Sequence, residues 1–138
     1  MTRIVNVAAA QLGPIQRSDS RAQVIERLLA HLHHAAAMGC HLVVFPELAL
    51  TTFFPRWYLE DPAEMDMFYE SQMPGPETQK LFDAAKQLGI GFYLGYAELA
   101  VENGVAHRYN TSILVGRDGE IIGKYRKVHL PGHAQNEP

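Results

Sequence analysis

The first 45 residues contain an apolar run, an amphipathic helical pattern and a second apolar run, and this order strongly constrains the fold. Residues 4–11 and 41–45 are short apolar runs typical of buried strands. Between them, Ser20 and Gln23 have the spacing of a helix capping box, and Gly39 stands where a helix commonly ends. Apolar residues recur at helical spacing inside these limits: Ile25, Leu28, Leu29, Leu32 and Ala36. A crossover of this length allows the two strands to pair in parallel, which predicts an α/β fold.

A long segment without a clear period follows the second strand, from residue 46 to residue 75. Loops of this length inside a compact domain are usually functional or disordered. The many aromatic residues of this segment argue against disorder, and we expect a short helical turn around 63–69. Residues 75–77 (Gly-Pro-Glu) then open a second helix, because proline suits the first turn and a carboxylate there favours the helix dipole. Gly89 ends that helix.

Three further strands are predicted in the last third of the chain. Residues 91–100 form the first, and Asn103-Gly104 is a strong hairpin signal into a strand near 107–115. A second turn at 117–119 leads into a strand at 120–126. Together with the first two strands, these elements predict one α/β domain with two helices on one face of the sheet.

Composition narrows the class of protein. The 138 residues carry a formal net charge of −3 and have a pI near 6.1, so nucleic acid is not an expected partner, because phosphate binding needs a basic face. No apolar stretch approaches the roughly 20 residues of a membrane-spanning helix. The single cysteine, Cys40, is typical of the reducing cytoplasm. His31 and His34 share a helix face without an acidic or cysteine partner, so no metal site is predicted.

Two charged residues stand where predicted strands end. Glu47 follows the strand at 41–45 and Pro46, which cannot donate to a strand ladder. Lys127 follows the strand at 120–126. If these strand ends converge, the lysine charge stabilises a developing oxyanion and the glutamate moves a proton. A structural salt bridge between the two strand ends is the alternative, and spacing alone favours it.

The residues around both positions resemble motifs of the nitrilase superfamily of carbon–nitrogen hydrolases. Val43–Leu48 is similar to the glutamate motif of that superfamily, and Gly123–Leu130 is similar to its lysine motif. The strand that begins Tyr109-Asn110-Thr111-Ser112 also fits. Longer strings, at 46–57 and 127–133, resemble one branch, the N-carbamoyl-D-amino-acid amidohydrolases (D-carbamoylases). The resemblance covers nearly the whole chain.

This resemblance implies the N-terminal part of a nitrilase-like αββα sandwich, usually assembled into dimers or larger homo-oligomers, without a metal or organic cofactor. By the same resemblance, Glu47 is the general base and Lys127 is the cation that stabilises the tetrahedral intermediate. The nucleophile of the family is a cysteine later in the chain, so residues 1–138 are expected to form a single domain that is incomplete at its C-terminus. Cys40 is no substitute, because it precedes the strand that Glu47 follows. It is expected to be a small packed thiol.

Other side chains are candidates for binding the substrate. His129 lies two residues beyond Lys127 and so faces the same side of an extended segment. The resemblance implies that His129 lines the active site, and a histidine bonded to local backbone is the alternative. Phe53, Phe54 and Trp57 either wall the substrate pocket or belong to a core or subunit interface.

Three hypotheses for function follow. The first, implied by the resemblance, is hydrolysis of N-carbamoyl-D-amino acids to D-amino acid, ammonia and carbon dioxide through a covalent intermediate. The second is another amidase or nitrilase-type hydrolase that uses the same glutamate and lysine. The third is a catalytically inactive binding or assembly module, because the chain holds no matching nucleophile. The strings at 53–57 and 129–133 favour the first hypothesis over the second.

Overall fold

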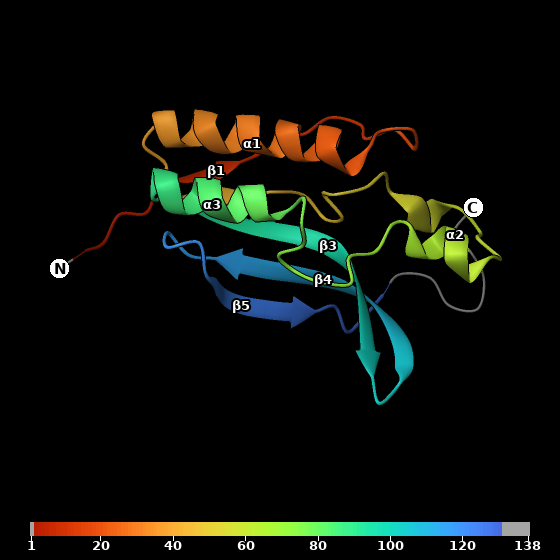
Figure 1. Ribbon diagram of the computed structural model, residues 1–138. Helices are drawn as coiled ribbons and strands as arrows, with labels where there is room; N and C mark the ends of the chain where they lie inside the picture. The colour runs from red at the N-terminus through yellow and green to blue at the C-terminus, as the bar shows by residue number, and fades with distance from the viewer. Residues whose placement is uncertain (1, 131–138) are drawn as a thin grey trace.

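The computed structural model describes residues 2–130, and a five-stranded sheet forms its framework (Figure 1). The first three strands pair in parallel and the last three pair in antiparallel fashion. In their order across the sheet they are β1 (Val7–Ala9), β2 (Leu42–Val44), β3 (Gly91–Glu102), β4 (Val105–Val115) and β5 (Ile121–Arg126). The predicted α/β fold class is confirmed, and so is the hairpin at Asn103-Gly104, where both residues have positive φ.

Two long helices, α1 (Arg21–Ala37) and α3 (Gln79–Leu88), lie on the same side of the sheet, as predicted (Figure 1). The capping box is present, since the Ser20 hydroxyl accepts from the Gln23 N–H and the Gln23 side chain accepts from the Ser20 N–H. Gly39 and Gly89 follow the helices with φ of 75° and 65°, the left-handed conformation that ends a helix. Local sequence signals therefore set these helix ends.

Two predicted boundaries were wrong. The first strand was expected at 4–11, but only Val7–Ala9 pairs, because β1 lies at the sheet edge and its neighbour β2 offers three residues in register. The second helix was expected to open at 75–77, but its regular turns begin at Gln79. Residues 75–78 form a turn instead, in which the Thr78 hydroxyl accepts from the Gly75 N–H at 2.7 Å. The Gly75 carbonyl also accepts from the Gln79 N–H at 2.9 Å, so this turn leads directly into α3.

The main hydrophobic core lies between the helices and the sheet. Alternate residues of β3 and β4 point toward the helices and are buried there, among them Phe92, Leu94 and Ile113. The residues between them point to the opposite face, where Tyr93 is 37% exposed and Tyr125 of β5 is 59% exposed. Cys40 packs against the edge of the core as a partly buried side chain, which is the role expected for it.

The segment between β2 and α3 is ordered by a second, smaller apolar cluster. It forms a 3₁₀ turn at Phe54–Arg56 and the helix α2 (Pro62–Asp66), close to the helical turn expected at 63–69. The ring of Phe54 stacks on Phe68 with centroids 4.8 Å apart and planes 9° from parallel. Leu48 and Ala97 complete the buried part of this cluster. The aromatic content of the segment therefore builds a wall beside β3.

The basic residues of β5 are paired on the helix side of the sheet. Glu98 of β3 accepts from Arg126 at 2.9 and 3.0 Å, from the Thr111 hydroxyl at 2.7 Å, and from Lys124. Burial opposes ionisation of Glu98, but these donors outweigh it and lower the pKa of the carboxyl to about 2. β5 lies at the edge of the sheet, but its charges are tied to Glu98 of β3.

Candidate active site

Three polar side chains from distant parts of the sequence meet on the face of the sheet opposite the helices. Glu47 follows the end of β2, Asn110 lies in β4, and Lys127 directly follows β5. The Lys127 Nζ donates to Glu47 Oε1 at 2.8 Å, and the Asn110 amide donates to the same oxygen at 2.6 Å. The two strand ends that carry Glu47 and Lys127 therefore converge.

Glu47 reaches this position because its backbone crosses directly over Gly95 of β3. A Cβ at Gly95 would lie 3.0 Å from Glu47 Cα, 3.1 Å from the Leu48 nitrogen and 3.2 Å from the Pro46 oxygen. The Ala49 N–H donates to the Gly95 carbonyl at 2.9 Å, which fastens the crossing segment to the strand. Leu48 has a φ of 48°, an uncommon conformation for a branched residue, at the point where the chain turns. Gly95 is thus the residue that allows Glu47 to lie close to the sheet.

Replacing Gly95 by alanine is expected to destabilise the protein by about 1–3 kcal/mol, because the new methyl group would push the backbone of residues 46–48 away from β3. Chemical denaturation of the two proteins measures this loss. Gly123→Ala is the matched control, because a Cβ at Gly123 would meet only Leu114 Cβ at an ordinary 3.7 Å. Equal stability of the two variants would contradict the close approach of Glu47 to Gly95.

The charge environment keeps Glu47 ionised. The hydrogen bond from Lys127 is the largest influence and lowers the pKa of Glu47, and the Asn110 amide and the lysine charge act in the same direction. Partial burial opposes them and is outweighed. At neutral pH the carboxylate therefore carries no proton and is able to accept one.

A polar cavity of about 410 Å³ surrounds this pair. His129 lies on its wall with Glu47 and Lys127, as expected from its position two residues beyond the lysine, and its side chain is exposed. The full set of lining residues is Glu47, Tyr93, Gly95, Asn110, Thr111, Ser112, Tyr125, Lys127 and His129. This cavity offers a carboxylate, an ammonium group and an imidazole to one bound molecule.

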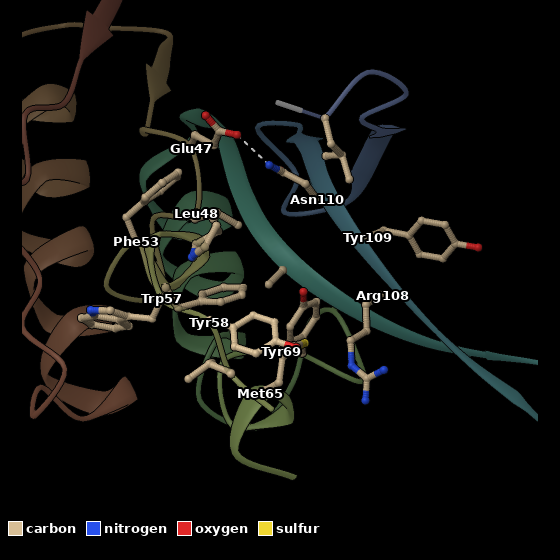
Figure 2. Close-up of a pocket in the computed structure, with 15 residues that line it drawn as sticks. Glu47, Leu48, Phe53, Trp57, Tyr58, Met65, Tyr69, Arg108, Tyr109 and Asn110 are labelled. Atoms are coloured by element: carbon tan, nitrogen blue, oxygen red, sulfur yellow. Dashed lines mark hydrogen bonds between the residues drawn. The ribbon is translucent and has the colours of Figure 1, made fainter. Parts of the chain in front are cut away.

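A second cavity of about 380 Å³, which we call the aromatic cavity, shares Glu47 and Asn110 with the polar cavity (Figure 2). Figure 2 shows Glu47 and Asn110 at one end of this cavity and Met65 at the other. Much of its wall is aromatic: Phe53, Phe54, Trp57, Tyr58 and Tyr69. Phe54 is buried in the second apolar cluster, whereas Phe53 is 45% exposed, so these side chains serve both as core and as cavity wall.

Two arginines line hollows that touch Glu47: Arg108 in the aromatic cavity and Arg56 in a neighbouring one. Arg56 is exposed, and its guanidinium lies 4.5 Å from the centre of the Trp57 ring. Arg108 lines the aromatic cavity, and its Nε donates to Asp66 at 2.7 Å. One of the two is therefore already paired with a carboxylate.

Sequence reasoning placed Glu47, Lys127 and His129 in one site but missed Asn110. The motif string Tyr109–Ser112 contained this residue, yet an asparagine within a strand carries no signal of its own. Cys40 stands before β2, whereas Glu47 stands after it, and Cys40 packs against the opposite, helix-covered side of the sheet. The stretch 131–133, also part of the motif, lies outside the described residues.

Neither a metal centre nor a membrane span is found in residues 2–130. Within this range no three histidine, cysteine, aspartate or glutamate side chains gather closely enough to hold a metal ion. No helix in the same range combines the length and apolar character needed to cross a bilayer.

Comparison with known proteins identifies the family. A family model described as carbon-nitrogen hydrolase matches residues 6–138, and the chain belongs to this family. It is 30% identical to an omega-amidase of Homo sapiens over 116 residues, which are 84% of this chain and 38% of the relative. It is 27% identical to an aliphatic nitrilase of Rhodococcus rhodochrous over 141 residues, with 97% of this chain and 37% of the relative covered. The chain thus spans less than two fifths of these relatives.

Solved structures agree with the fold. A carbon-nitrogen hydrolase from Helicobacter pylori superimposes with a TM-score of 0.71 at 22% identity, covering 92% of this chain and 40% of the other. An N-terminal amidase superimposes with a TM-score of 0.69 at 23% identity, covering 91% and 28%. The predicted nitrilase-like fold, as part of a longer architecture, is confirmed. The resemblance to the D-carbamoylase branch stays a prediction.

Proposed function

We propose that the protein carrying this chain hydrolyses N-carbamoyl-D-amino acids to the D-amino acid, ammonia and carbon dioxide. The observation that carries this proposal is the ion pair of Glu47 and Lys127 on the wall of the polar cavity. Glu47 acts as the general base, Lys127 stabilises the oxyanion, and His129 contacts the substrate. The strings at 46–57 and 127–133, which resemble D-carbamoylases, support this choice of substrate.

Glu47 carries the proton between the reacting groups in this reaction. A thiol gives its proton to the carboxylate, and the sulfur forms a bond to the carbamoyl carbon while the carbonyl electrons move onto oxygen beside Lys127. Collapse of this intermediate breaks the carbon–nitrogen bond, and the departing nitrogen takes the proton from Glu47 and leaves as ammonia. Water then attacks the same carbon and gives its proton to Glu47, the carbon–sulfur bond breaks, and the proton passes to the sulfur, which restores the thiol. The resulting carbamate loses carbon dioxide.

The thiol in this scheme is proposed to come from outside these 138 residues, within the same hydrolase domain. Cys40 does not fit the role, because it packs against the helix-covered core and stands at the other end of β2 from Glu47. The intact mass of the natural protein tests this point. A mass above 15.4 kDa is expected, whereas a mass of 15.4 kDa would leave the third hypothesis, an inactive binding or assembly module.

A second candidate function is hydrolysis of a primary amide or a nitrile. The relatives matched above include an omega-amidase and an aliphatic nitrilase, at 30% and 27% identity. Both functions need a base and a cation arranged like Glu47 and Lys127. The two candidate functions differ in the substrate that is bound and not in the catalytic pair.

Release of ammonia from three sets of compounds tests the two candidates. The natural protein is incubated with N-carbamoyl derivatives of D- and L-amino acids, with primary amides that include ω-amides of dicarboxylic acids, and with aliphatic nitriles. The proposal expects the highest kcat/KM with the N-carbamoyl-D-amino acids. Faster turnover of amides or nitriles would select the second candidate, and no turnover of any compound would reject both.

The resemblance also supports a homo-oligomer as the working form of the protein, and the single cysteine supports a cytoplasmic location. Light scattering on the natural protein measures its assembly directly. A particle mass at least twice the chain mass is expected, and a monomer at micromolar concentration would reject this part of the proposal.

A further inference from the structure

We propose that Asn110 is a positioning residue that fixes the orientation of the Glu47 carboxylate and thereby selects which of its two oxygens carries the proton. This inference rests on the proposed function, because it assumes that Glu47 moves a proton. Nothing in the sequence pattern assigned a role to Asn110, whose contacts emerge only when β4 lies between β3 and β5.

Asn110 contacts both members of the charged pair. Its side-chain amide donates to Glu47 Oε1 at 2.6 Å, and its main-chain carbonyl accepts from the Lys127 N–H at 2.8 Å. The second bond extends the β4–β5 pairing by one residue beyond Arg126. Asn110 thus binds both the backbone of Lys127 and the carboxylate of Glu47 that pairs with this lysine.

The two donors converge on a single oxygen of Glu47. Lys127 Nζ and Asn110 Nδ2 both bind Oε1, at 2.8 and 2.6 Å, and within residues 2–130 no hydrogen bond to Oε2 is present. A carboxylate oxygen that already accepts two hydrogen bonds is a poor site for a further proton. Oε2 is therefore the oxygen that takes the proton from the thiol and returns it to the departing nitrogen. With Lys127 as its single donor, the Glu47 carboxylate would be freer to rotate.

Several other charged or titratable groups surround Glu47, and the test must separate them from Asn110. Within residues 2–130, Lys127 is the only cationic side chain whose nitrogen lies within 4 Å of the Glu47 carboxylate. The remaining groups line the cavities that touch Glu47: His129, Tyr93 and Tyr125 in the polar cavity, Arg108, Tyr58, Tyr69 and Tyr109 in the aromatic cavity, and Arg56 in a third hollow behind residues 46–49. All of them are unchanged in a variant at position 110.

The first experiment follows the titration of Glu47 by carbon-13 NMR of labelled glutamate in the natural protein, with the signal assigned by its loss in Glu47→Gln. It needs no substrate. Asn110→Leu removes the donor, so the Glu47 titration is expected to move to higher pH. Asn110→Asp has almost the same size as asparagine and is expected to move it further, because a second carboxylate repels the first. If Asn110→Leu does not fold, Asn110→Asp carries the test. Unchanged titrations would overturn the inference.

The second experiment measures kcat/KM against pH with the best substrate. For Asn110→Leu we expect kcat to fall about tenfold to a hundredfold, the effect of losing one hydrogen bond to a charged group, with KM nearly unchanged. The acidic limb of the profile is expected to move to higher pH with the titration. Gln79→Leu is the control, since it also removes a side-chain amide that donates to a carboxylate (Asp83, at 2.9 Å), but on an exposed part of α3 outside both cavities. Its acidic limb is expected to stay at the wild-type position.

The outcomes separate this inference from the proposed function. If Glu47→Gln keeps its activity, the proposed function fails whatever happens at Asn110. If Glu47→Gln is inactive and Asn110→Leu keeps both the wild-type kcat and the wild-type acidic limb, the role of Asn110 fails and the function stands. A loss of kcat with an unmoved limb would indicate a merely structural residue and would also overturn the inference.

Discussion

Replacing Glu47 by glutamine in the natural protein is expected to lower kcat by about a hundredfold to ten-thousandfold, the usual contribution of a general base. The glutamine amide has the size of the carboxylate but cannot take a proton from the thiol. It also loses the ion pair with Lys127, which lies 2.8 Å away. Folding is expected to survive, because the Glu47 side chain is 48% exposed and its backbone is held by other contacts. Release of ammonia under saturating substrate measures the loss.

Glu102→Gln is the matched control for this experiment. Glu102 is also a glutamate at the end of a strand, is 46% exposed and pairs with Arg126 at 2.8 Å, but it lies at the hairpin end of β3 and lines neither cavity. Its replacement is expected to leave kcat within about twofold of wild type, as is usual for exposed surface pairs. Turnover by Glu47→Gln at the level of Glu102→Gln would remove Glu47 from the mechanism.

Replacing Lys127 by methionine is expected to lower kcat/KM by about a hundredfold to a thousandfold, the typical effect of removing one group that stabilises an oxyanion. Methionine keeps the length of the side chain and deletes its charge. Because Lys127 is the main influence that lowers the pKa of Glu47, the acidic limb of the pH profile is also expected to move to higher pH. The sign follows from the loss of the cation, which favours the neutral carboxyl over the carboxylate. A profile measured from pH 4 to pH 9, roughly the range that spans ordinary carboxyl and imidazole titrations, records both effects.

Lys124→Met is the matched control for Lys127→Met. Lys124 lies three residues earlier, on β5, and binds Glu98 on the helix side of the sheet. Glu98 keeps Arg126 and Thr111 as partners in this variant, so folding and turnover are expected to persist. A loss of activity as large as that of Lys127→Met would point to the stability of β5, and not to the charge of Lys127, as the cause.

Much of the fold was predictable because its signals are local. The ends of α1 follow from Ser20, Gln23 and Gly39, and the hairpin follows from Asn103-Gly104. The boundaries that failed have other causes. The length of β1 is set by its partner β2, far along the chain, and residues 75–78 form a turn, held by the Thr78 hydroxyl, before the regular part of α3. The wall formed by Phe54 and Phe68 likewise needs β3 beneath it, so periodicity alone could not place it.

The candidate site was predictable in part for the same reason. Glu47, Lys127 and His129 stand in strings that resemble motifs of a family, and the structure brings all three to one cavity. Asn110 is separated from Glu47 by 63 residues, and their meeting depends on the register of β3 with β4. The crossing over Gly95 also leaves no trace in a single sequence, since a glycine inside a strand is equally consistent with a bulge.

The close approach of the Glu47 backbone to Gly95 also bears on which parts of the site are free to change by mutation. Glu47 is placed over the strand by its main chain, because the backbone of residues 46–48 fills the space a Cβ at Gly95 would need and the Ala49 N–H donates to the Gly95 carbonyl at 2.9 Å. Phe53 and Tyr58, in contrast, contribute side chains to the aromatic cavity. Substitutions at those two positions would reshape the volume offered to a ligand while the Glu47 carboxylate stays in place. Single mutations are thereby free to change the shape of the aromatic cavity while the Glu47–Lys127 pair is retained.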